Sequence, residues 1–290
     1  MSRLKLSQES IGFGYGFLGV LIFSLTLPAT RLAIADLDPV FVGLGRAIIA
    51  AGLSLILLIV TRQKIPPWQY FYRFAVVIGG VIVGFPLLTA IAMRDTSASY
   101  GSIITGLIPL ATALFGVWRG REKVSRSFWI FAIIGSGLIV VFTLVSGRGS
   151  LRVADFALLG AVVTCSMGYA EGAALSRIFG AWQVICWSLV FSVPLLLPIV
   201  LRHLPADYSS ISVNAWLGFV YVGVFSMFLG FIAWYKGLAM GGIARVSQIQ
   251  LIQPFLTILA SVILFGEPLT MMNIGFASGV IICVASSKRS

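Results

Sequence analysis

The chain has 290 residues, of which 59% are hydrophobic and only 10% charged, and it carries a net charge of +11. Because a soluble domain has about 25% charged residues, this composition excludes a globular soluble enzyme and indicates a protein embedded in a lipid bilayer. The basic excess would suggest nucleic acid in a soluble chain, but in a membrane protein Lys and Arg collect on cytoplasmic loops, so we expect no nucleic-acid partner.

The apolar runs of the chain predict its architecture, because each has about the 20 residues that cross a bilayer. In chain order they are residues 11–34, 40–61, 71–93, 98–118, 128–146, 153–177, 182–201, 213–236, 244–264 and 272–287. The first run exceeds the roughly 7–15 residues of a signal-peptide core and is expected to be a retained helix. The chain is therefore predicted to be an all-α integral membrane protein with ten transmembrane helices.

The distribution of basic residues over the loops predicts the orientation. Over alternate loops, fourteen basic residues fall on one side of the membrane, and five fall on the other: Arg31, Arg94, Arg148, Arg152 and Arg202. Because cytoplasmic loops carry the excess of Lys and Arg, both the N- and the C-terminus are expected in the cytoplasm. The expected location is a bacterial-type inner (plasma) membrane, which the chain crosses many times.

An internal repeat relates the two halves of the chain. Shifting the sequence by 145 residues aligns residues 102–122 with residues 247–267, and seven of these 21 positions are identical, including Pro109 with Pro254 and Glu122 with Glu267. Five helices per half is an odd number, so the second half must enter the membrane from the opposite side. We therefore predict two inverted repeats, residues 1–147 (helices 1–5) and 148–290 (helices 6–10), the architecture of many alternating-access transporters.

Polar residues accompany the prolines of predicted helices 4 and 9. Pro109 and Pro254 each remove a hydrogen bond from the middle of a helix, and they act either as static kinks or as hinges beside a central cavity. At about 100° per residue, the residues on or beside the proline face are Ser102 and Thr105 in the first half and Ser247, Gln250 and Gln253 in the second. These stripes either line a cavity or form interhelical hydrogen bonds.

Two ionisable residues fall inside predicted helices. Arg46 lies about 10 Å into helix 2 at 1.5 Å per residue, where an arginine is costly unless it is paired. It is expected to bond helix-end carbonyls or Asp36 or Asp38, to bind a substrate carboxylate, or to snorkel to the interface. Glu171 is expected either to form a salt bridge near the cytoplasmic face, for example with Arg177, or to carry a proton or cation.

The aromatic residues divide into two predicted groups. Those expected in the interfacial belt are Trp68, Tyr70, Tyr72, Trp118, Trp129, Trp234 and Tyr235. Deeper rings are candidates for stacking on an amphipathic metabolite. The predicted substrate-binding residues are Ser24, Thr26, Thr89, Tyr100, Ser102, Thr105, Tyr169, Trp187, Tyr221, Ser226, Ser247, Gln250 and Gln253.

No metal, cofactor or catalytic constellation is expected. The chain has no GxxxxGK phosphate loop, a single histidine, His203, and three cysteines without metal-ligand spacing. We therefore expect neither an enzyme nor a disulfide framework, and ATP-driven transport would need another subunit.

Together these features resemble the drug/metabolite transporter superfamily, in particular its ten-helix EamA-type branch. The matching residues are Arg46 after Pro39, Glu122 after Pro109, Glu267 after Pro254, and the closing stretch from Gly275 to Gly279. Phe23 and Ser24 stand where many members have Trp-Gly. The resemblance implies a substrate site near the midplane between helices 1, 3, 4, 6, 8 and 9. Among members the chain looks closest to exporters of small neutral or aromatic amino acids and similar amphipathic metabolites.

Two other functions stay open. Exchange of phosphorylated or nucleotide-linked metabolites requires a cationic cluster at mid-membrane, and a non-transport membrane scaffold predicts a closed centre without a cavity. The expected partners are a small-molecule metabolite, first an amino acid, and the bilayer. Gly275 and Gly279 form a small-xxx-small face that permits close helix packing, within a monomer, as we favour, or in a dimer.

Overall fold

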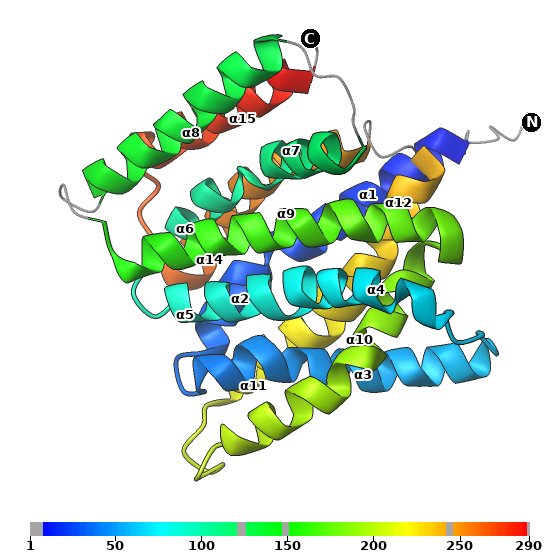
Figure 1. Ribbon diagram of the computed structural model, residues 1–290. Helices are drawn as coiled ribbons and strands as arrows, with labels where there is room; N and C mark the ends of the chain where they lie inside the picture. The colour runs from blue at the N-terminus through cyan, green and yellow to red at the C-terminus, as the bar shows by residue number, and fades with distance from the viewer. Residues whose placement is uncertain (1–7, 121–125, 147–150, 242–245, 289–290) are drawn as a thin grey trace, which may run out of the picture.

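The computed structural model describes residues 8–120, 126–146, 151–241 and 246–288, and every regular element in these ranges is helical (Figure 1). The first half contains α1 (Gln8–Ser24), α2 (Thr26–Ala33), α3 (Pro39–Val60), η1 (Trp68–Tyr70), α4 (Phe71–Val77), η2 (Ile78–Gly84), α5 (Phe85–Ala92), α6 (Ala98–Thr105), α7 (Ile108–Gly120) and α8 (Arg126–Ser146). The second half contains α9 (Val153–Phe179), α10 (Ala181–Arg202), α11 (Val213–Val220), η3 (Tyr221–Gly230), α12 (Phe231–Gly241), η4 (Ser247–Ile252), α14 (Gln253–Phe265) and α15 (Met271–Lys288).

These elements join into ten apolar helical segments. Six are long and apolar enough to cross a membrane: residues 10–33, 39–60, 68–92, 153–179, 181–202 and 213–237. Within the described residues, the other four apolar stretches are shorter, at residues 98–112, 133–142, 249–265 and 271–283. The predicted class, an all-helical multi-pass membrane protein, is confirmed.

Several segments are irregular near their middle, and of these irregularities the sequence predicted only those at Pro109 and Pro254. The first segment breaks at Leu25 between α1 and α2, and the fourth breaks between α6 and α7. The third and eighth segments each contain a π-helix, η2 and η3. A shift of 145 residues places residues 78–84 of η2 on residues 223–229, inside η3, so the same irregularity recurs in both halves. Such π-turns are frequent at functional sites.

Contacts between segments also recur when the two halves are exchanged. The first segment packs on the eighth, through α1 and α12. The sixth and third segments, which are equivalent to those two, pack on each other through α9 and α5. Three further pairs join equivalent segments of the two halves: α3 with α10, α8 with α15, and α6 with α14 (Figure 1). The fold therefore consists of two related halves whose fourth and ninth segments meet each other.

Glycines bring some of these helices into direct backbone contact. A Cβ atom added to Gly80 in η2 would lie 2.5 Å from the Thr164 carbonyl oxygen and 2.7 Å from the Cα of Gly168, both in α9. On α15, a Cβ added to Gly279 would lie 3.1 Å from Leu138 of α8, whereas Gly275 faces open space. Gly279 therefore serves a contact within the chain, whereas Gly275 does not.

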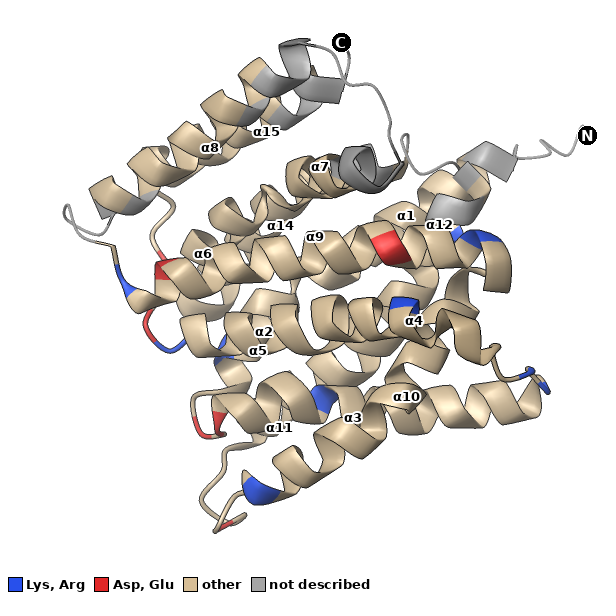
Figure 2. Ribbon diagram, in the orientation of Figure 1, with Lys and Arg blue, Asp and Glu red and all other residues tan. Residues whose placement is uncertain are grey.

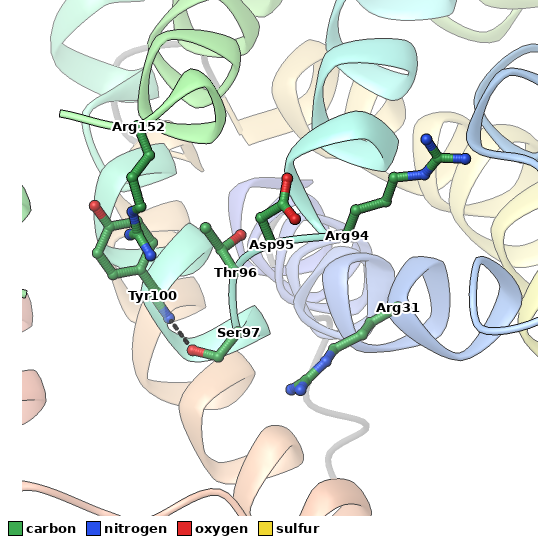
Figure 3. A pocket seen from close by; sticks show the side chains of 7 residues that line it. All are labelled: Arg31, Arg94, Asp95, Thr96, Ser97, Tyr100 and Arg152. Carbon is green, nitrogen blue, oxygen red and sulfur yellow. Dashed lines mark hydrogen bonds between the residues drawn. The ribbon is translucent and has the colours of Figure 1, made fainter. Parts of the chain in front are cut away.

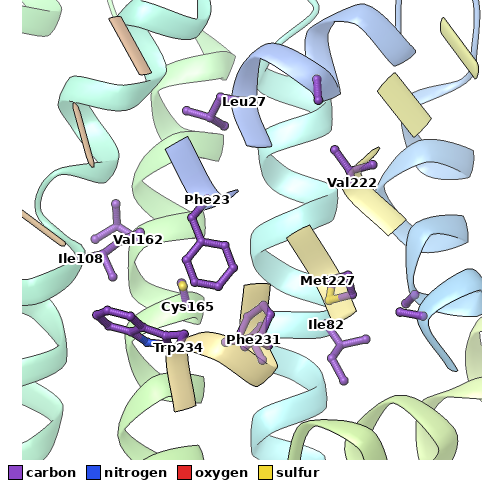
Figure 4. Packing of buried hydrophobic residues seen from close by; sticks show 14 of the residues in the cluster. Phe23, Leu27, Ile82, Ile108, Val162, Cys165, Val222, Met227, Phe231 and Trp234 are labelled. Atoms are coloured by element: carbon purple, nitrogen blue, oxygen red, sulfur yellow. The ribbon is translucent and has the colours of Figure 1, made fainter. Parts of the chain in front are cut away.

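Aromatic rings fill the core between α1, α9 and α12. The Phe23 ring lies 5.2 Å from the Phe231 ring and 6.4 Å from Trp234 (Figure 4). Trp234 and Tyr235 are only 2% and 1% exposed, so their predicted place in the interfacial belt is wrong. They are near the end of a helix, but α1 and α9 cover that end. Trp68, by contrast, is 80% exposed, as expected for a belt residue.

Candidate functional site

A small cavity of about 10 Å³ lies where the fourth and ninth segments meet. Its lining consists of Ser102, Thr105, Gly106, Ile108, Pro109, Gln250, Gln253, Pro254 and Thr257. The two prolines therefore lie together with all four polar residues of the predicted stripes whose side chains the structure describes, and Thr257 is an addition. The lining contains hydroxyls, amides and apolar groups but no charged residue.

The prolines at this centre stand at the start of the helices that follow the breaks. Pro109 is the second residue of α7 and Pro254 is the second residue of α14, so their missing N–H groups fall in a first turn, where an N–H has no helical acceptor. The carbonyl oxygen of Gln250 accepts from the Gln253 N–H where η4 passes into α14. The two prolines therefore stand beside the breaks of the fourth and ninth segments.

At the break in the first segment, backbone carbonyl groups accept hydrogen bonds from side-chain hydroxyls of other segments. Pro28 removes the helical partner of the Ser24 carbonyl, and the Thr257 hydroxyl donates to that oxygen at 2.7 Å. The Tyr221 hydroxyl donates to the neighbouring Ile22 carbonyl at 3.0 Å. Because Thr257 also lines the central cavity, the break between α1 and α2 adjoins that cavity.

Arg46 lies in a polar cluster on the other flank of this break. Its Nη2 donates to the Ser226 hydroxyl in η3 at 2.8 Å, and Ser226 in turn hydrogen-bonds Thr26 at 2.8 Å. Arg46 is 2% exposed, so it does not snorkel. Neither of the expected aspartates contacts it, because Asp36 accepts from the Ser212 N–H and Asp38 caps the start of α3.

Tyr169 of α9 connects these polar groups to the aromatic core. Its hydroxyl lies within interaction distance of Gln250 and the Cys165 thiol, and it is close enough to Arg46 for an electrostatic interaction. Its ring meets Phe231 edge-on, with 6.1 Å between centroids. Tyr169, a predicted substrate-binding residue, thus lies between the polar cluster of Arg46 and the aromatic core.

Thr89 and Trp187, two of the predicted substrate-binding residues, lie away from the cavity lining. Thr89 is fully buried and donates to carbonyls of its own helix, those of Phe85 and Pro86. Trp187 stacks on Phe191 at 5.3 Å, within α10. The sequence shows which polar or aromatic residues lie inside a membrane span, but it does not show which neighbouring helix their side chains contact.

The side chains of several residues named in the sequence analysis lie outside what the structure describes, including those of the belt candidates Trp118 and Trp129. The side chain of Ser247 is outside what the structure describes, although its backbone begins η4. Glu122 lies in residues 121–125, which are also outside the described ranges.

Glu171 is buried in α9 and forms an ion pair with Arg73 of α4. Their side chains are 3% and 14% exposed. The expected salt bridge therefore exists, but its partner comes from the third segment and not from Arg177. The sequence missed Arg73 because it was counted only as a cytoplasmic loop charge.

Charged residues otherwise gather toward the ends of the helices (Figure 2). At the end that carries residues 93–97, an open pocket of about 380 Å³ is lined by Arg31, Arg94, Asp95, Thr96, Ser97, Tyr100 and Arg152 (Figure 3). We call it the 93–97 pocket. Tyr100, predicted for the central cavity, lines this pocket instead, and its hydroxyl donates to Asp155 at 2.5 Å.

The arginines of the 93–97 pocket are held by acidic partners. Arg31 pairs with Glu267, Arg94 lies 3.7 Å from Asp38, and Arg152 lies 3.4 Å from Asp155 and over the Tyr100 ring. The Glu267 carboxylate also accepts from the backbone N–H groups of Ala98 and Ser99 at 3.3 Å. Glu267, just after α14, is therefore bonded both to the start of α6 and to Arg31 of α2. Among the described residues, no group of His, Cys, Asp and Glu side chains suits a metal ion.

Comparison with known proteins gives one consistent result. The model of the EamA-like transporter family matches residues 10–144 and again residues 152–287. The chain is similar to the uncharacterized transporter YdeK of Bacillus subtilis (strain 168), with 46% identity over 284 residues, covering 98% of this chain and 99% of that protein. It is also similar to an uncharacterized transporter of Archaeoglobus fulgidus, with 25% identity over 269 residues, covering 91% and 94%.

A solved crystal structure shares the fold. Its TM-score to this chain is 0.68, with 18% identity, and the match covers 96% of both chains. At this identity the likeness concerns the fold alone.

Proposed function

Because the chain belongs to the EamA-like transporter family, and is a membrane transporter and not an enzyme, we propose that it exports small neutral and aromatic amino acids and similar amphipathic metabolites. The observation that carries the proposal is the uncharged polar cavity between Pro109 and Pro254. Hydroxyls and amides there offer hydrogen bonds to a polar solute without selecting for charge. The adjoining rings of Tyr169 and Phe231 offer apolar surface to its side chain.

The proposed mechanism is alternating access by two inverted repeats. Corresponding helices α3 and α10 run in opposite directions in Figure 1, which supports the inversion. The cavity of about 10 Å³ holds at most about one water, so a metabolite enters only when the fourth and ninth segments separate. The proline breaks in both segments are suited to act as the hinges. Both termini are proposed to lie in the cytoplasm of a bacterial-type inner membrane, and the unit is proposed to be a monomer.

In this orientation the 93–97 pocket faces the cell exterior. The Arg31–Glu267 pair and the Glu267 bonds to α6 then close the route between the repeats on that side. Glu171 is proposed to be a structural partner of Arg73 and not the residue that couples transport to protons.

The proposal is tested with purified protein in liposomes loaded with labelled leucine or phenylalanine, with and without a pH gradient. We expect saturable flux that unlabelled neutral amino acids compete for. Replacing Gln250 or Gln253 by leucine removes a hydrogen bond worth about 1 kcal/mol, so the flux at low substrate should fall about fivefold. Gln69→Leu, at an exposed position of η1, is the matched control.

Two outcomes contradict the proposal. Flux of sugar phosphates without flux of any amino acid would favour exchange of phosphorylated metabolites. Unchanged flux and selectivity in both glutamine variants would place the substrate elsewhere.

A further inference from the structure

We propose that Arg46, oriented by Ser226 and Thr26, is the subsite that binds the carboxylate group of the transported solute. The inference rests on the proposed transport function and narrows its substrate class to monocarboxylates, which include amino acids. It starts from one observation, which is that a guanidinium group is almost completely buried with a spare donor. Arg46 is 2% exposed, and its Nε atom is buried without a hydrogen-bond partner.

A buried cation in this state needs an anion. An arginine is costly to place within a membrane unless it is paired, and a buried ionised group without a counter-charge is strongly unfavourable. No ion pair among the described residues involves Arg46. The nearby acids are already engaged, because Asp38 caps α3 and faces Arg94, and Asp36 accepts from Ser212.

The contacts that Arg46 does make leave part of its donor fork open. Among the hydrogen bonds of the described residues, the guanidinium group makes one, from Nη2 to the Ser226 hydroxyl at 2.8 Å. Thr26 holds Ser226 in turn at 2.8 Å, so both hydroxyls fix the guanidinium in place. An arginine fork binds a carboxylate through two parallel N–H···O bonds, and a hydroxyl pair beside it adds further donors.

The location fits a solute in the central cavity. Thr26 and Ser24 flank Leu25 at the break of the first segment, and the Ser24 carbonyl is bonded by Thr257, which lines the cavity. A solute between the fourth and ninth segments therefore needs to reach only past this break to present a carboxylate to Arg46. Its uncharged remainder would stay among Gln250, Thr257 and the aromatic rings.

The charge count selects a carboxylate over a phosphate. Arg46 is the only Lys or Arg that is buried among the described side chains. A phosphate monoester carries up to two charges at pH 7, and one guanidinium leaves one of them without a partner. A monocarboxylate matches the single positive charge.

The test measures ligand-induced stabilisation of the detergent-purified protein, which requires no transport. The probes are phenylacetate, L-phenylalanine and L-leucine, each compared with its own amide: phenylacetamide, L-phenylalaninamide and L-leucinamide. We expect at least one acid to raise the Tm of the wild type while its amide does not. In Arg46→Gln the apparent affinity for that acid should fall about tenfold to a hundredfold, the range for hydrogen bonds to charged groups, and Arg46→Lys should keep part of it.

Arg202→Gln is the matched control, because it removes one positive charge at an exposed position of α10 and should bind like the wild type. If Arg46→Gln does not fold, the comparison is made with Arg46→Lys and with Ser226→Ala, each of which should weaken acid binding. The proposal is overturned if no acid stabilises the wild type more than its amide, or if folded Arg46 variants keep the preference. Acid binding that depends on Arg46 without amino-acid flux in liposomes would refute the proposed transport of amino acids and leave the subsite standing.

Discussion

Prolines and hydroxyls together make the polar centre of this membrane protein. A proline within a helix leaves the carbonyl oxygen four residues earlier without a donor, and a Thr hydroxyl from a neighbouring segment supplies one at Ser24. The bond joins the first and ninth segments through the main chain of one of them. A proline that removes a bond within one helix thereby leaves a carbonyl oxygen that a neighbouring helix can bond.

The buried ion pair Glu171–Arg73 gives a prediction about stability. Replacing Glu171 by Gln leaves the Arg73 guanidinium without its counter-charge in a site where both side chains are at least 86% buried, which should cost about 3 kcal/mol. Removing both charges in Glu171→Gln/Arg73→Gln should cost less than Glu171→Gln alone. Thermal unfolding of the purified variants measures both effects.

The control for this pair is Arg177→Gln, at an exposed position near the end of the same helix α9, which should unfold like the wild type. If Glu171 instead carries the coupling proton, Glu171→Gln will retain its stability and lose the dependence of flux on the pH gradient. That result would contradict the structural role.

Sequence reasoning found most of the central residues, since polar groups and prolines in apolar helices stand out by type. It identified Pro109 on predicted helix 4, and Pro254 and Gln250 on one face of predicted helix 9. It missed Thr257, although the repeat aligns it with Thr112, because a threonine in an apolar helix commonly bonds its own turn. Partners such as Arg73 depend on the packing of whole segments and have no local signal.

Irregular helices are the main feature at the level of elements. The π-helices η2 and η3 occupy equivalent places in the third and eighth segments, and each contains glycines. In η2, Gly80 lets the backbone touch α9, where a Cβ would lie 2.5 Å from the Thr164 carbonyl oxygen. The wide π-turn and the missing side chain thus serve one close contact between the third and sixth segments.

A pair of neighbouring glycines tests this contact. Gly80→Ala should force η2 and α9 apart and destabilise the protein by about 1–3 kcal/mol, the range for overpacking. Gly79→Ala, one residue earlier in the same π-helix, faces open space and should change stability by less than about 1 kcal/mol. Thermal unfolding of the two variants in the same detergent compares them directly, and equal losses would show that the contact does not constrain the packing.

The apolar runs predicted where the segments begin and end, because burial in lipid requires a continuous apolar stretch. For example, the run at residues 40–61 corresponds to α3 at Pro39–Val60. The runs did not predict the breaks at Leu25 or in η2. An α-helix, a π-helix and a 3₁₀ helix have the same apolar composition, and the choice among them is made by contacts with other segments.

The whole molecule is organised as two related halves that meet at the fourth and ninth segments. The family model matches both halves, and the contacts between segments recur when the halves are exchanged. Polar groups concentrate at this meeting point, while ion pairs such as Arg31–Glu267 lie toward one end. The uncharged cavity lining, with Arg46 as the buried positive charge beside it, is consistent with the transport of neutral or zwitterionic solutes proposed above.

The inverted arrangement predicts that equivalent loop positions lie on opposite sides of the membrane. Lys64, between α3 and η1, and Ser209, between α10 and α11, are 145 residues apart and both exposed. With five helices per repeat and the cytoplasmic termini proposed above, we expect Lys64 inside and Ser209 outside. The three native cysteines are buried, so single cysteines introduced at these positions can be followed in the otherwise unchanged chain.

In intact cells, a membrane-impermeant maleimide should label Ser209→Cys and leave Lys64→Cys unlabelled until the membrane is permeabilised. The wild type should stay unlabelled in both conditions, because its thiols are covered by neighbouring helices. Labelling of both variants from the same side would rule out an inverted repeat, since it requires an even number of crossings between the two positions. Labelling of Lys64→Cys alone would keep the inversion and reverse the orientation, placing the 93–97 pocket in the cytoplasm and contradicting the positive-inside assignment.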